Sequence, residues 1–164
     1  MRVDDVFTGA DNFFAAYAPN AQPGLLVEGL GSRYEVTRTD IKKWSVGTPI
    51  QAPLDALELL RRQRPFVAED VTEVVVRLAP TVGAVVDNRD NPDICLQHMV
   101  AVMLLDGKVT FASSHDEKRM RNPKVLALRE KIELRGDDAL SAAMPSRQGI
   151  VEIALRDGRH LRYH

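Results

Sequence analysis

The stretch from Asp93 to Leu105 limits the possible folds more than any other part of this sequence. Apolar side chains occupy nearly every position around a helix over this range, and Asp106-Gly107 follows as a helix stop. A helix that is apolar on all sides is stable only when other elements cover it. The sequence therefore predicts a central buried helix, enclosed by the rest of a domain.

Other elements are predicted ahead of this helix. A helix is expected to begin at Thr48-Pro49, with Thr as the cap and Pro in the first turn, and to end before Pro65. The β-branched run from Val71 to Leu78 predicts a half-buried strand. Residues 33–44 also favour an extended strand, with three apolar side chains directed inward: Tyr34, Val36 and Ile41.

The elements predicted after the central helix complete the evidence for the fold class. Asn122-Pro123 is typical of the start of another helix. The runs Ile150 to Leu155 and His160 to Tyr163 flank Asp157-Gly158, a strong signal for a β-hairpin. Helices and antiparallel strands thus alternate without repeated strand-helix-strand units. The predicted class is α+β, with an antiparallel sheet packed against helices.

Length and composition exclude several functional classes. A chain of 164 residues suits one domain with a substantial core. The balance of 22 basic and 23 acidic residues gives no field that would attract nucleic acid or an anionic membrane. No apolar run approaches the ~20 residues of a membrane span, so neither nucleic acid nor membrane is expected as a partner. The single cysteine, Cys95, excludes an intramolecular disulfide and favours a cytoplasmic location.

Self-contained catalytic motifs are absent from the sequence. It has no Gly-rich phosphate loop, no nucleophile elbow, no HExxH and no calcium-binding loop. His160 and His164 alternate with basic residues and have no acidic or cysteine partner at ligand spacing. No metal and no cofactor are therefore predicted.

The segment from Lys42 to Asp55 combines features that suit an anion. Two cations and an aromatic residue precede Gly47 and the predicted helix start. A lysine beside a helix N-terminus adds a full charge to the partial charge of unpaired N–H groups, which favours a carboxylate or a phosphate. The alternative is a solvated pair of surface lysines, since lysine is rarely buried.

This segment resembles the start of the C-terminal domain of the MmgE/PrpD family, which includes 2-methylcitrate dehydratase, cis-aconitate decarboxylase and an iminodisuccinate epimerase. Lys42 falls on the family lysine, Trp44 on its aromatic residue and Asp55 on its helical Asp, while Gln51 stands where His is common. The resemblance continues through residues 97–110, 115–125 and 151–158, and covers roughly residues 24–164.

The resemblance implies two parts of the chain. Residues 1–32 resemble the tail of a preceding helical domain, and residues 33–164 resemble the α+β C-terminal domain. Several aromatic residues of the first part are unlikely to lie in water: Phe7, Phe13, Phe14 and Tyr17. They predict a short helix near Asp11 to Tyr17 docked on the body, or a segment that is disordered or held by a partner chain. Self-association as a homodimer is expected.

The resemblance also implies the site. In the family, the lysine lines a cleft between two domains and faces a polycarboxylate substrate. Removal of water from a β-hydroxy acid builds enolate-like charge beside a carboxylate, and a cation held there stabilises the transition state. Lys42 is expected to supply that cation, with the proton-abstracting group on the helical domain or subunit. Four neighbours are expected to bind substrate: Lys43, Trp44, Thr48 and Gln51.

Two histidines leave alternatives open. His98 lies in the apolar helix beside Gln97, and is either a core histidine hydrogen-bonded to backbone or a catalytic acid or base whose pKa is tuned by burial. His115-Asp116 follows two serines, and capping of a helix start is favoured there over catalysis.

Two functions from different classes remain. The first is the small domain of a lyase or isomerase acting on a di- or tricarboxylic acid, active only with its helical domain. The second is a catalytically silent dimerisation or small-anion-binding domain. Gln51 in place of His favours the second, and the intact Lys42 and Trp44 favour the first. Dehydration, decarboxylation and epimerisation all begin with charge beside a carboxylate, so the sequence does not separate them.

Overall fold

The computed structural model describes residues 6–9, 12–18 and 20–164. The chain divides into two compact units, Met1–Ile41 and Lys42–His164. Residues 33–41, which the sequence assigned to the C-terminal domain, therefore group with the N-terminal segment. The likeness of that segment to the tail of a helical domain stays a prediction.

The N-terminal unit consists of short local turns. Helix α1 spans Phe13–Tyr17 and begins at Asn12, whose side chain accepts a hydrogen bond from the Ala15 N–H. The predicted short helix is thus present, although Asp11 lies outside the described residues. Rings within this unit contact one another, with centroids 5.0–6.4 Å apart in the pairs formed by Phe7, Phe13, Phe14 and Tyr17. Among the described residues up to Ile41, none is buried.

The prediction of a strand over residues 33–44 is wrong. A single 3-10 turn, Glu35–Arg38, stands in its place, and Val36 and Ile41 are 74% and 96% exposed rather than directed inward. The hydroxyls of Thr37 and Thr39 donate to carbonyls three residues back, at 2.7 and 2.8 Å. These local bonds replace sheet bonds, because β-favouring residues form a strand only beside a partner strand.

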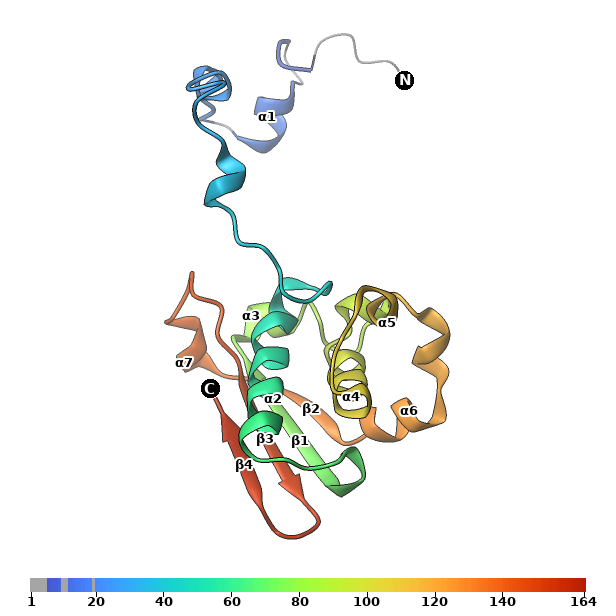
Figure 1. Cartoon of the computed structure of the whole chain (residues 1–164). Coiled ribbons are helices and arrows are strands. Elements are labelled where there is room, and N and C mark those ends of the chain that lie inside the picture. Colours follow the sequence, from blue (N-terminus) through green and yellow to red (C-terminus); the bar gives the residue numbers. More distant parts are fainter. Residues whose placement is uncertain (1–5, 10–11, 19) are drawn as a thin grey trace. The chain divides into compact units, whose positions relative to one another are not determined.

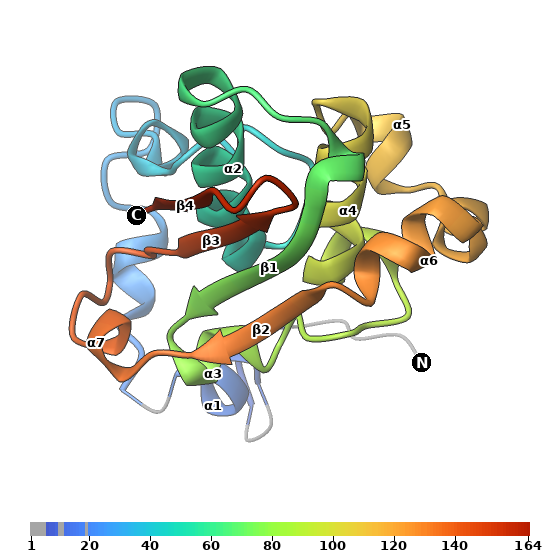
Figure 2. The same cartoon turned by 90° about the horizontal axis from the view of Figure 1, so that it is seen from below.

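A four-stranded sheet forms the base of the second unit (Figures 1 and 2). Its order is β2-β1-β3-β4, and its strands are β1 (Val71–Leu78), β2 (Ile132–Gly136), β3 (Ile150–Leu155) and β4 (His160–Tyr163). The strand β1 and the β3-β4 hairpin have the predicted bounds, and the α+β class is confirmed. The sheet is mixed rather than purely antiparallel, because β2 pairs parallel with β1.

Two helices lie side by side on one face of this sheet, α2 (Gln51–Gln63) and α4 (Leu96–Asp106), as Figures 1 and 2 show. Every residue from Leu96 to Leu104 is buried, which confirms the predicted central helix. It begins at Leu96 because Asp93 belongs to a separate 3-10 turn, Pro92–Ile94. A third helix, α6 (Pro123–Arg129), packs against α4. Short helices fill the connections: α3 (Pro80–Gly83), α5 (Phe111–Ser114) and α7 (Asp138–Ser141).

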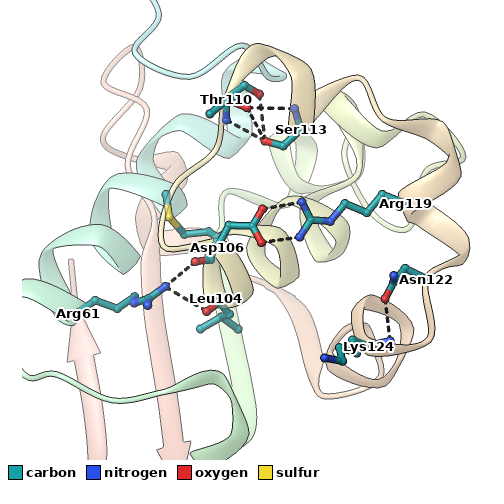
Figure 3. A network of polar contacts seen from close by, with 9 residues as sticks. Arg61, Leu104, Asp106, Thr110, Ser113, Arg119, Asn122 and Lys124 are labelled. Atoms are coloured by element: carbon teal, nitrogen blue, oxygen red, sulfur yellow. Dashed lines mark hydrogen bonds and ion pairs between the residues drawn. The ribbon is translucent and has the colours of Figure 1, made fainter.

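The C-terminal end of α4 is tied to α2 (Figure 3). The Arg61 guanidinium on α2 donates to the carbonyls of Met103 at 2.6 Å and Leu104 at 3.1 Å. These carbonyls belong to the last turn of α4, where helix carbonyls lack their usual partners. The Met103 carbonyl also accepts from the Gly107 N–H at 3.0 Å. Gly107 follows with φ +75°, a left-handed conformation that glycine adopts at little cost.

Side-chain hydrogen bonds also hold the segment that follows α4 (Figure 3). Asp106 accepts two hydrogen bonds from the Arg119 guanidinium, a bidentate pair that spans the segment. Within it, Thr110 and Ser113 form a reciprocal capping box at the start of α5. Asn122 caps α6 through the Lys124 N–H, as predicted. The loop that carries α5 is therefore fixed at several points.

Candidate functional site

A hollow of about 620 Å³ opens on the second unit, and we call it the Lys42 hollow. Three segments line it: residues 42–47, the turn at Asp93 and Ile94, and the stretch that contains Val109, Thr110, Phe111 and His115. Its volume lies in the range of about 300–1,000 Å³ that small-molecule sites occupy. Residues far apart in the sequence thus meet at one opening.

Lys42 lines this hollow. Its Nζ donates a hydrogen bond of 3.1 Å to the carbonyl of Val46, so the side chain folds back over its own loop. An ammonium group has three donors, and this bond uses one of them. Within the part of the chain that the structure describes, no carboxylate lies within ion-pair distance of this amine. In the described structure, the charge of Lys42 therefore lies at the opening without a carboxylate counterion.

Lys43 has a different environment, although it is adjacent in sequence. Its Nζ contacts two carboxylates of α2, Asp55 at 3.0 Å and Glu58, and lies 4.7 Å from the centre of the Trp44 ring. The hydrogen bond with Glu58 is the main cause that raises the pKa of Lys43. Because two acids compensate its charge, Lys43 is less available to an anion than Lys42 is.

Trp44 and Gln51 hold the loop that carries both lysines. The Gln51 amide accepts from the Trp44 N–H at 3.1 Å and donates to the Trp44 carbonyl at 2.8 Å and the Val46 carbonyl at 3.3 Å. The Trp44 indole is buried and donates to Asp55 at 3.0 Å. Gln51 does not line the hollow, and its amide groups are bonded to backbone.

Thr48 is not the helix cap that the sequence predicted. It begins a 3-10 turn, Thr48–Ile50, that runs directly into α2, and Gly47 occupies the capping position without a side-chain bond. Thr48 does not line the hollow either. The Gly47 N–H instead donates to the Asp93 carbonyl at 2.8 Å, which joins this loop to the turn before α4.

His98 lies in the core and not at the hollow. It is 0% exposed, and neither of its ring nitrogens has a hydrogen-bond partner among the described residues. Burial lowers its pKa from 6.5 to about 4, assisted by the positive charges of Arg129 and Arg119. His98 is buried, as the interpretation of a core histidine expected, but among the described residues it lacks the hydrogen bond to backbone that this interpretation included. Its alternative role as a catalytic acid or base stays a prediction. The structure does not bring His98 together with Lys42.

His115 reaches the hollow instead. Its ring stacks on Phe111 with centroids 4.3 Å apart, and its Nδ1 lies 2.8 Å from the Phe111 carbonyl oxygen. A carbonyl only accepts, so Nδ1 carries the hydrogen and the neutral ring has its lone pair on Nε2. A helix start is capped here as expected, but the cap is the Asp116 side chain, which accepts from the Arg119 N–H at 3.1 Å, and not the expected serine hydroxyl. Sequence reasoning could have found His115 as a site residue only from its position directly after a short helix with a capped start.

Residues 44–164 match the family model described as the MmgE/PrpD C-terminal domain. The chain belongs to the MmgE/PrpD family. This membership confirms the resemblance drawn from the sequence and agrees with the mixed α+β fold. Lys42 and Lys43 precede the matched range directly.

Relatives of known activity match part of the chain. The mitochondrial 2-methylcitrate dehydratase of Yarrowia lipolytica is 29% identical over 102 residues, which are 56% of this chain and 19% of that protein. The 2-methylcitrate dehydratase of Salmonella typhimurium is 37% identical over 81 residues, or 46% of this chain and 17% of that protein. The matched part thus spans less than a fifth of either relative. Over the residues described, no helix combines the length and apolarity that crossing a bilayer requires.

Proposed function

We propose that this chain is the small domain of a lyase or isomerase related to 2-methylcitrate dehydratase, and that it binds a di- or tricarboxylic acid at Lys42. The observation that carries the proposal is the Lys42 ammonium, which lines the hollow and has no carboxylate partner within the described residues. Membership of the MmgE/PrpD family and the names of the two relatives support the class of substrate.

In this proposal, Lys42 acts on charge that develops during the reaction. As a base removes the carbon-bound proton, negative charge builds on the neighbouring carboxylate, and a cation beside it stabilises the transition state more than the ground state. Removal of one such donor typically costs about 3 kcal/mol of transition-state stabilisation. Gln51 and Trp44 serve this role indirectly, because they hold the backbone loop from which Lys42 projects.

The proposal also includes a partner. The proton-abstracting group and the rest of the cleft come from a helical domain or subunit of the same enzyme, because the matched part covers at most 19% of the relatives. The assembled enzyme is a cytoplasmic homodimer in this proposal. Turnover of 2-methylcitrate by the 164-residue chain on its own would contradict the need for that partner.

A silent anion-binding or dimerisation domain is the second candidate. One observation favours it: Gln51 stands where the family commonly has His, and its amide is bonded to backbone of its own loop. An amide also cannot shuttle a proton near neutral pH. Binding of a carboxylate without turnover, even after the helical domain is supplied, would select this candidate.

Calorimetric titration of the chain with citrate and 2-methylcitrate tests the site. Lys42→Met is expected to weaken binding about tenfold, because one charged hydrogen bond of about 1.4 kcal/mol is lost. Lys124→Met is the matched control: it removes the same charge from an exposed position that does not line the hollow, and binding should change less than about twofold. Equal affinities for Lys42→Met and the unchanged chain would overturn the proposal.

A further inference from the structure

Besides its two lysines, the Lys42 hollow contains a histidine that can bear positive charge. Lys42 approaches it from the loop before α2, and His115 approaches it from the end of α5. The other charged groups of the lining are Lys43, whose charge Asp55 and Glu58 compensate, and Asp93. Of the lining groups that can bear positive charge, Lys42 and His115 are the two without a carboxylate partner among the described residues, and each can receive an anionic part of one ligand.

Three contacts restrict the orientation of the exposed His115 ring before any ligand arrives. Stacking on Phe111 sets the plane of the ring, and the contact of Nδ1 with the Phe111 carbonyl sets its rotation. Ser114, which is fully buried, adds a contact of 2.9 Å to the same nitrogen. A ring held in this way loses little conformational entropy on binding. The edge that bears Nε2 is turned away from this carbonyl.

The backbone beneath the ring is held as well. The capping box of Thr110 and Ser113 fixes the start of α5, and the bidentate pair of Asp106 and Arg119 closes the segment that contains it.

We infer that His115 is a specificity-determining residue, and that its Nε2 binds a second carboxylate of the acid whose first carboxylate is bound by Lys42. This inference rests on the proposed function, because it takes Lys42 as the first anchor. Neutral Nε2 has no proton to donate, so binding takes up one proton from solvent and the imidazolium then donates Nε2–H to the carboxylate. The hollow consequently selects acids with at least two carboxylates over monocarboxylates.

Titration with succinate and with propionate tests this selection. The unchanged chain is expected to bind succinate at least about tenfold more tightly than propionate, since one additional charged hydrogen bond forms. His115→Gln should reduce that ratio to about twofold and leave propionate binding unchanged. His160→Gln, at an exposed histidine outside the hollow, is the matched control and should keep the full ratio. If His115→Gln still bound succinate at least about tenfold more tightly than propionate, the inference would be overturned.

Proton uptake separates a direct role from a structural one. Calorimetry in two buffers of different ionisation enthalpy, at a pH where NMR shows His115 to be neutral, should report uptake of about one proton with succinate and none with propionate. The ¹⁵N resonance of Nε2 should move to the imidazolium range with succinate alone. Absence of both signals in a chain that still binds succinate through Lys42 overturns the role of His115 and leaves the proposed function intact. Failure to bind either acid overturns both.

Discussion

The two units of this chain differ in what they do with their apolar residues. In residues 42–164, the helix α4 is buried along most of its length between α2, α6 and the sheet. In the described residues of the N-terminal unit, no side chain is buried, although Leu25, Leu26, Val27 and Leu30 follow closely on one another. Apolar content alone therefore does not make a core, because a core also needs elements that can surround it.

The type of hydrogen bond shows the same difference. Among the described residues of the N-terminal unit, most hydrogen bonds connect residues three or four apart, as in the turns at Ser32 and Thr37, and the longest in sequence joins Phe13 to Val6. In the second unit, Arg61 contacts α4 across 42 residues of sequence and Lys131 contacts β1 across 60. Exposed apolar side chains joined only by local bonds are typical of a segment that packs against another surface.

The largest predicted effect compares two leucines. Leu57→Ala in α2 should lower the free energy of unfolding by about 3 kcal/mol, because Leu57 is 0% exposed and its removal leaves a cavity. Leu26→Ala, at a residue that is 55% exposed in the N-terminal unit, should change it by less than about 0.5 kcal/mol. Denaturant unfolding measures both. Similar losses for the two variants would break the comparison.

The second predicted effect is a pH dependence of the free energy of unfolding, which comes from His98. Its pKa in the folded chain is about 4, below the ordinary 6.5, so the unfolded chain binds a proton at a higher pH than the folded chain does. Stability that is fully present above about pH 6.5 is therefore lost as the pH falls toward 4, by up to about 3 kcal/mol in total.

Unfolding free energies at pH 7 and pH 4.5 test this effect. His98→Leu should remove a large part of the pH dependence, because leucine fills much of the same space and does not titrate. His160→Gln, at an exposed histidine of β4, should retain it. An unchanged slope in His98→Leu would assign the pH dependence to other groups.

The smallest predicted effect compares two ion pairs. Arg119→Gln should cost about 1 kcal/mol, because its bidentate pair with Asp106 is partly buried and closes the segment around α5. Arg38→Gln removes the exposed Arg38–Glu35 pair of the N-terminal unit and should cost less than about 0.5 kcal/mol. Thermal unfolding of both variants sharpens the comparison. A greater loss from Arg38→Gln would show that the N-terminal unit carries tertiary structure.

Most regular elements of the second unit were predictable because their signals are local. The apolar surface of α4, the alternation along β1 and the Asp157-Gly158 turn each specify one element without reference to distant residues. The strand β2 was missed, because its short sequence follows α6 directly and becomes a strand through its parallel pairing with β1. The strand predicted over residues 33–44 does not form. The reason is the opposite one, since no partner strand lies beside these residues in the described structure.

The candidate site likewise combines residues that the sequence predicted with features that only the tertiary structure reveals. Lys42, Trp44 and the helical Asp55 followed from a motif in which spacing carries the information, and family membership is confirmed by residues 44–164. The contrast between Lys42 and Lys43 did not follow from it, because it depends on which lysine reaches Asp55 and Glu58 across a loop. The placement of His98 in the core and of His115 at the hollow likewise depends on how α4 and α5 turn.

The sequence by itself determined the family, the α+β class and the segment that supplies a cation, since each depends on residue order over short distances. Only the tertiary structure decided which lysine has no carboxylate partner among the described residues, which histidine lines the same hollow, and where the chain stops enclosing its apolar residues. The physical reason is that charge compensation, burial and strand pairing are properties of neighbours in space. Distant segments become neighbours only once α2, α4 and the sheet have packed.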